Sequence, residues 1–93
     1  MIKMQEVYRN LNYGASPGTP LYKVREIFIN PDHIASLRQK GGLERVLVEG
    51  IGSEADVEFC AITLSEAGRE IIVVGHVEDV HKKIYGGAKL LHG

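Results

Sequence analysis

The pattern of hydrophobic residues in the second half of the chain constrains the fold more than any other feature. Residues 57–65 (VEFCAITLS) and 69–74 (REIIVV) are rich in β-branched and aromatic residues, which favour strands. The segment between them contains Gly68, which can adopt the positive φ that a tight hairpin turn needs. The pattern therefore predicts an antiparallel hairpin over residues 57–74.

The hydrophobic period changes to that of a helix after this hairpin, over residues 76–85 (HVEDVHKKIY). One face of the segment is apolar at helical spacing and carries Val77, Val80 and Ile84. Acidic residues occupy the first turn and lysines the last, which suits the helix dipole. We expect His76 to cap the start of this helix. Gly86 is a natural C-terminal cap, so the sequence predicts that the helix ends there.

Further strands are predicted in the first half of the chain. Residues 21–29 (LYKVREIFI) alternate at first and then become apolar on both faces, which predicts a strand that enters the sheet interior. Asn30-Pro31-Asp32 forms a turn, after which residues 33–38 resume as an extended segment. Looser alternation predicts a strand over residues 2–8, and glycine and proline predict a loop over residues 9–20.

Residues 43–49 (LERVLVE) fit either a helix or a strand, and their β-branched content favours a strand. The expected architecture is α+β: a small, curved antiparallel sheet or open barrel of about five strands with one C-terminal helix. We expect a single domain over residues 1–93, with an N-terminal strand and Gly/Pro loop (1–20), the sheet and helix (21–85) and a tail (86–93). The predicted core consists of Ile27, Ile29, Ile34, Leu37, Phe59, Cys60, Ile62, Leu64, Ile71, Val73, Val77, Val80 and Ile84.

Charge and cysteine content limit the classes of function. Eleven basic and 12 acidic residues give a net charge of -1, so no field of one sign attracts nucleic acid or anionic lipid. Cys60 is the single cysteine, which excludes an intrachain disulfide and suits a reducing compartment. We expect it to be buried as a small apolar side chain. The chain shows no secretory or membrane-spanning segment, so we expect a cytoplasmic protein without a membrane partner.

No arrangement of residues predicts a catalytic, cofactor or metal site. His76 and His81 are five positions apart, which places them on different sides of a helix, and zinc needs three or four convergent ligands. The glycine-containing segments 14–20 and 50–55 lack the spacing of nucleotide-binding loops. None of the serines lies in a nucleophile elbow. We therefore expect a protein that is not an enzyme and that needs no cofactor.

A candidate interaction surface combines basic and aromatic residues: Arg38, Lys40, Arg45, Tyr22 and Tyr85. Such a surface could bind single-stranded nucleic acid through base stacking and phosphate contacts. The alternative is an ordinary soluble surface of mixed charge.

Two segments, IFINPDHIASLR (27–38) and AITLSEAGREIIVVGHVEDVHKKI (61–84), resemble the small flagellar proteins of the FlbD/SwrD type. The matching residues are Asn30, Pro31, Asp32, Ile34, Thr63, Leu64, Gly68, Val77, Val80 and Ile84. The resemblance covers roughly half of the chain, which departs from the pattern in its segment through Pro20 and in an insertion between Arg38 and Phe59. It implies a small β-rich domain with a C-terminal helix and a motility-related accessory role, without catalytic residues.

Three functions stay open at this point. The first is a non-enzymatic interaction or assembly protein whose partner is another copy of itself or a different protein, such as an accessory protein of motility or of a phage virion. The second is a small nucleic-acid-binding regulator. The third is an enzyme whose site would form only in an oligomer, by bringing His33 or His76 to acidic residues across an interface.

Overall fold

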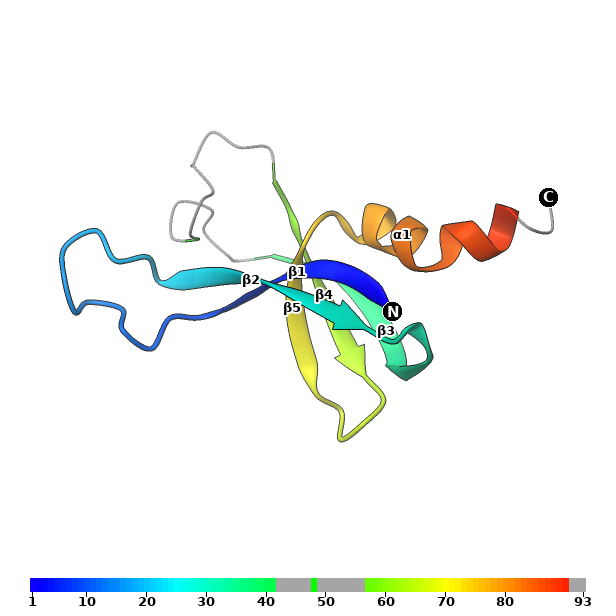
Figure 1. The fold of residues 1–93 in the computed structure, drawn as a ribbon, viewed down its shortest axis with the longest axis horizontal. Coiled ribbons are helices and arrows are strands. Elements are labelled where there is room, and N and C mark those ends of the chain that lie inside the picture. Colours follow the sequence, from blue (N-terminus) through cyan, green and yellow to red (C-terminus); the bar gives the residue numbers. More distant parts are fainter. Residues whose placement is uncertain (42–47, 49–56, 91–93) are drawn as a thin grey trace.

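The computed structural model describes residues 1–41, 48 and 57–90. In chain order, its elements are β1 (Ile2–Arg9), β2 (Tyr22–Ile29), the 3-10 helix η1 (Pro31–His33), β3 (Ile34–Lys40), β4 (Phe59–Leu64), β5 (Glu70–Val74) and α1 (Val77–Leu90). The strands form one antiparallel, five-stranded sheet in the order β2-β1-β5-β4-β3 (Figure 1). The predicted fold class, α+β with a curved sheet and one C-terminal helix, is confirmed.

The sheet is strongly curved because a short link joins its two edge strands. β2 and β3 lie at opposite edges, and the only residues between them are 30–33. A flat sheet of this many strands would separate its edges by about 19 Å. The link is mostly 3-10 helix, which advances only about 2 Å per residue. The edges must therefore curl toward each other, and Figure 1 shows the strands crossing steeply.

Side chains on both sides of this corner fix its geometry. Asn30 caps η1, since its Oδ1 accepts a hydrogen bond from the Asp32 backbone N at 3.0 Å. The Ser65 backbone N and Oγ both donate to the carbonyl oxygen of His33, at 2.7 and 3.1 Å. The Asn-Pro-Asp turn and the end of the β4 strand, which are far apart in sequence, are therefore joined directly.

The main hydrophobic core lies between one face of the sheet and α1. Eight of the predicted core residues are buried: Phe59 lies on the opposite face of the sheet, and seven lie in this core, namely Ile29, Cys60, Ile62, Ile71, Val73, Val80 and Ile84. The other predicted core residues are partly buried and pack against this core: Ile27, Ile34, Leu37, Leu64 and Val77. Met4 from β1 is also buried here, although the loose alternation of residues 2–8 did not identify it.

A second, smaller cluster covers the opposite face of the sheet. Its buried members are Val7, Val48 and Phe59. Val48 also forms an isolated parallel bridge with Tyr22. The strand predicted over residues 43–49 otherwise lies outside the described residues.

The prediction that residues 21–29 enter the sheet interior is wrong, because β2 is an edge strand. Phe28 is 60% exposed as a result. The strand is apolar on both faces near its end for a different reason. Ile27 and Ile29 face the main core, whereas Phe28 points to the other side at the open edge.

α1 begins where the sequence predicts, but it ends later than predicted. The backbone N of Glu78 donates to Nδ1 of His76 at 3.1 Å, which confirms His76 as the N-cap. Gln39 of β3 accepts a second first-turn hydrogen bond, from the Val77 N at 3.0 Å, and so ties the helix to the sheet. The predicted end at Gly86 is wrong, since α1 continues to Leu90. Glycine permits a cap without requiring one, and the residues after Gly87, namely alanine, lysine and leucine, all favour helix.

The residue that directly follows β5 must be glycine. Gly75 has φ +136, and a Cβ at this position would lie 3.1 Å from Cγ2 of Val80. Gly75→Ala is therefore expected to lower the free energy of unfolding by about 1–3 kcal/mol, from backbone strain and crowding. Urea denaturation followed by circular dichroism measures the change.

Gly41→Ala is the matched control, because its Cβ would meet nothing within 4 Å and its φ is not in the positive range. We expect a change within about 0.5 kcal/mol for this surface substitution. Equal destabilisation by both variants would contradict the role assigned to Gly75.

Candidate functional site

The β1–β2 hairpin projects from the rest of the molecule and ends in the loop 10–21, which we call the arm tip (Figure 1). The molecule measures 52 × 31 × 20 Å and has a Cα radius of gyration of 14.5 Å. A compact domain of this length has a radius of gyration of about 12 Å. The arm at one end and α1 at the other account for the extended shape.

A buried asparagine holds the arm tip in one conformation. Asn10 is only 6% exposed. Its Nδ2 donates to the Pro20 carbonyl at 2.7 Å, and its Oδ1 accepts from the Asn12 backbone N at 3.0 Å. Its backbone N also donates to the Leu21 carbonyl at 2.9 Å, which continues the ladder of the hairpin. One side chain therefore ties the two strands of the arm together at the base of the loop.

The arm tip presents apolar side chains to solvent. Leu11 is 95% exposed and Tyr13 is 52% exposed. A single exposed leucine is ordinary on a protein surface. Leu11 and Tyr13 differ from an ordinary exposed residue because they lie on a projecting loop whose backbone is already ordered. Little conformational entropy is therefore lost when a binding partner covers them.

An open groove of about 390 Å³ lies between the end of β2 and the turn that joins β4 to β5, and we call it the end groove. Its floor is apolar and is formed mainly by Ile27, Ile29, Leu64 and Ile71. Phe28 also lines it, from the open edge of β2. The groove exists because the curled sheet brings the ends of β2 and β4 close together.

One wall of the end groove carries an ion pair between Glu6 and Arg25. Glu6 is a buried carboxylate, with its side chain 11% exposed, and its Oε1 lies 2.7 Å from Nε of Arg25. The Arg25 guanidinium also sits over the Tyr8 ring, 4.3 Å from its centre. The hydrogen bond to Glu6 raises the pKa of Arg25. The pair holds Arg25 in place and leaves this wall of the groove without a free charge.

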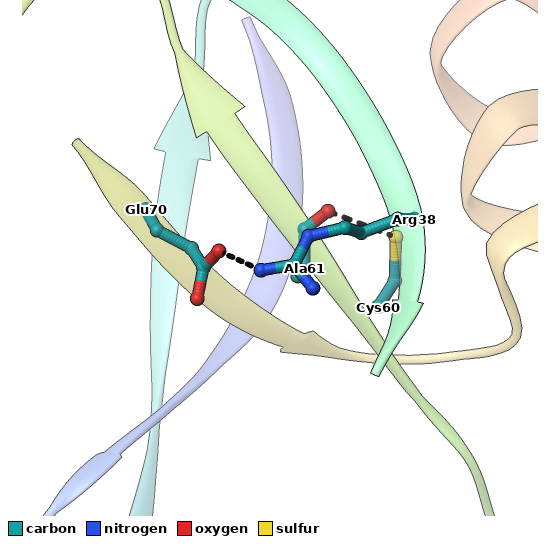
Figure 2. A network of polar contacts seen from close by, with 4 residues as sticks. All are labelled: Arg38, Cys60, Ala61 and Glu70. Atoms are coloured by element: carbon teal, nitrogen blue, oxygen red, sulfur yellow. Dashed lines mark hydrogen bonds and ion pairs between the residues drawn. The ribbon is translucent and has the colours of Figure 1, made fainter. Parts of the chain in front are cut away.

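The structure distributes the predicted surface residues over separate regions. Arg38 of β3 reaches across β4 to form an ion pair with Glu70 of β5 (Figure 2). Lys40 lies two residues along the same strand, on the same face. Tyr22 lies on β2, at the opposite edge of the sheet, and packs half-buried against the second cluster.

The other two predicted residues do not join this group. Tyr85 lies on α1 and packs its ring against His81, with 5.0 Å between the ring centres. Arg45 lies outside the described residues. The structure therefore brings Arg38 and Lys40 together on one strand and places the two tyrosines elsewhere.

Cys60 is fully buried in the main core, and its Sγ lies 3.8 Å from the Ala61 carbonyl oxygen (Figure 2). Burial raises the pKa of this thiol, which keeps it protonated and unreactive. Within residues 1–41, 48 and 57–90, no three histidine, cysteine or acidic side chains are grouped closely enough to hold a metal ion. In the same part of the chain, no helix has the length and apolar character needed to cross a membrane.

Comparison of the chain with models of protein families, with curated proteins and with solved structures gives no match.

Sequence reasoning missed both the arm tip and the end groove. Leu11 and Tyr13 were visible as large apolar residues inside a Gly/Pro loop, and that combination is the signal that could have identified the arm tip. The end groove has no comparable signal, since its floor residues come from three strands that meet only in the folded sheet.

The burial of Cys60 predicts slow modification by a thiol reagent such as dithionitrobenzoate. In native buffer the thiol is reached only when the core opens, so we expect labelling at least about 100-fold slower than in denaturant. Absorbance of the released thiolate measures both rates. Immediate stoichiometric labelling of the folded protein would contradict the assignment of Cys60 to a closed core.

Removing the Asn10 side chain is expected to loosen the arm tip. Asn10→Ala deletes a buried group that makes two hydrogen bonds, so the free energy of unfolding should fall by about 1–2 kcal/mol. Asn12→Ala is the control, because it changes an exposed side chain and keeps the backbone N that bonds to Asn10. Urea denaturation of both variants tests the difference, and equal stability would contradict the role of Asn10.

Proposed function

We propose that this protein is a non-enzymatic interaction and assembly protein that docks onto another protein chain, with a second copy of itself as the first candidate. The observation that carries the proposal is the arm tip, where Leu11 is 95% exposed on a loop fixed by the buried Asn10. Contacts made by such a side chain release water from apolar surface, which favours association.

The residues shared with FlbD/SwrD-type proteins support the proposal only through the fold. Asn30 caps the corner helix, and Val80 and Ile84 pack α1 on the core. These residues build a scaffold and form no reaction site. A motility-related accessory role remains part of the proposal on the strength of that resemblance, which is an analogy between folds.

The structure gives less support to the alternative of nucleic-acid binding. A stacking surface needs aromatic rings next to cations that can reach phosphates. Tyr22 and Arg38 lie at opposite edges of the sheet, and Arg38 is already paired with Glu70.

Binding through the arm tip predicts that Leu11→Ser removes association without affecting the fold. Because Leu11 is almost fully exposed, its replacement should change stability by less than about 0.5 kcal/mol. Light scattering after size-exclusion chromatography at two concentrations measures self-association. Retention of proteins on the immobilised chain, followed by their identification, measures binding to other partners.

We expect the wild-type protein to bind a second copy or another protein, and Leu11→Ser to lose that binding. Tyr85→Ser is the matched control, since Tyr85 is an exposed aromatic residue far from the arm on α1, and it should keep the binding. A wild-type chain that stays monomeric and retains no protein in these assays would refute the proposed function.

A further inference from the structure

We propose that this protein assembles head to tail, with the arm tip of one copy occupying the end groove of the next. The inference rests on the proposed function, and it names both the partner and the two surfaces that meet. The end groove is the apolar depression floored by Ile27, Ile29, Leu64 and Ile71, and the arm tip supplies Leu11 and Tyr13.

The two surfaces lie at opposite ends of the β1–β2 hairpin. Arg9 pairs with Tyr22 at the base of the arm, whereas Ile2 pairs with Ile29 at the other end, beside the end groove. These pairs are separated by seven residues along each strand, or about 24 Å. Because the arm tip and the groove lie at opposite ends of this hairpin, a copy cannot fill its own groove. A contact between two different surfaces repeats from copy to copy and produces a ring or an open chain.

Neither the arm tip nor the end groove carries a net formal charge on its side chains, so the two surfaces do not repel each other. Residues 10–22 contain no aspartate, glutamate, lysine, arginine or histidine. The end groove is lined by His33 and by two carboxylates and two guanidinium groups, from Glu6, Glu66, Arg25 and Arg69, and the formal charges of these last four sum to zero. A strongly acidic or basic partner would gain little there, whereas an uncharged loop can cover the apolar floor without burying a charge of its own. The arm tip of a second copy is such an uncharged loop with apolar side chains.

The sizes are also compatible. The volume of the groove, about 390 Å³, lies in the range of pockets that enclose small-molecule ligands, about 300–1,000 Å³. It can therefore accept two side chains. An interface of one loop and one groove is small, and small interfaces form transient complexes. We therefore expect weak association, with a dissociation constant of about 1 μM or higher.

Complementary variants provide the sharpest test. Leu11→Glu disables the arm tip and leaves the groove intact, while Phe28→Glu places a charge at the rim of the groove, on the open edge of β2, and leaves the arm intact. Both residues are mostly exposed, so neither substitution disturbs the core. Tyr85→Glu is the control, since it adds the same charge at an exposed aromatic residue outside both surfaces. Sedimentation velocity should cover concentrations from about 10 μM to about 1 mM, where weak complexes form.

We expect the wild type and Tyr85→Glu to form species that grow with concentration beyond the dimer. Leu11→Glu alone and Phe28→Glu alone should associate at least about tenfold more weakly, since each must bury a charge. A mixture of the two should form a one-to-one dimer and nothing larger, because it contains a single intact pair of surfaces.

Other outcomes overturn the inference in distinguishable ways. If the wild type associates and both variants associate equally well, the surfaces are wrong and the assembly function stands. If mixing the variants restores no dimer, the arm tip and the groove do not bind each other. If the wild type is monomeric throughout, head-to-tail assembly is refuted, and only capture of a different partner can sustain the proposed function.

Discussion

The short link between the two edge strands is the constraint on which the rest of the structure depends. Residues 30–33 join β2 to β3, although three other strands lie between them in the sheet. A link of this length cannot cross a flat sheet, so the sheet curls and its concave face closes over the main core. The capping of η1 by Asn30 and the two hydrogen bonds from Ser65 to His33 give this corner a defined geometry.

The curl has two consequences for function. It brings the end of β2 close to the β4–β5 turn and so creates the end groove. β1 pairs with β5 at Glu6 and Val7, so among the described residues the far end of the β1–β2 hairpin has no sheet neighbour besides the isolated bridge from Tyr22 to Val48. The part of the hairpin toward Arg9 and Tyr22 becomes the projecting arm, whereas the part around Ile2 and Ile29 lies beside the end groove. One constraint on connectivity therefore produces both an apolar protrusion and an apolar depression at opposite ends of a small domain.

Most of the fold could be predicted from local patterns in the sequence. The hairpin of β4 and β5, the start of α1 at His76 and most of the core follow from hydrophobic period and turn residues, which act over short distances. The edge position of β2 could not be predicted in this way. A strand that is apolar on both faces fits the sheet interior as well as an edge beside a groove, and only the pairing of strands distinguishes them. The end of α1 was missed because a glycine cap is a preference.

The candidate site was even harder to predict from local sequence patterns than the fold. Sequence clustering of basic and aromatic residues suggested one surface, but Tyr22 and Arg38 lie at opposite edges of the sheet. Leu11 stood in a loop, where an apolar residue carries no periodic signal. Its exposure follows from the projection of the arm, and the groove follows from the curl. The groove in particular cannot be identified from a short stretch of sequence, because its floor residues come from three strands.

Amide chemical shifts recorded by NMR over a concentration series locate the surfaces through which copies associate, because one measurement reports on every part of the fold. The account predicts that shifts change with concentration at two places only: in the arm tip around Leu11 and Tyr13, and around the groove residues Ile27 and Ile71. The signals of Tyr85 on α1 and Arg38 on β3 should stay constant. Concentration-dependent shifts along β3 instead, or none in the arm tip, would contradict the account.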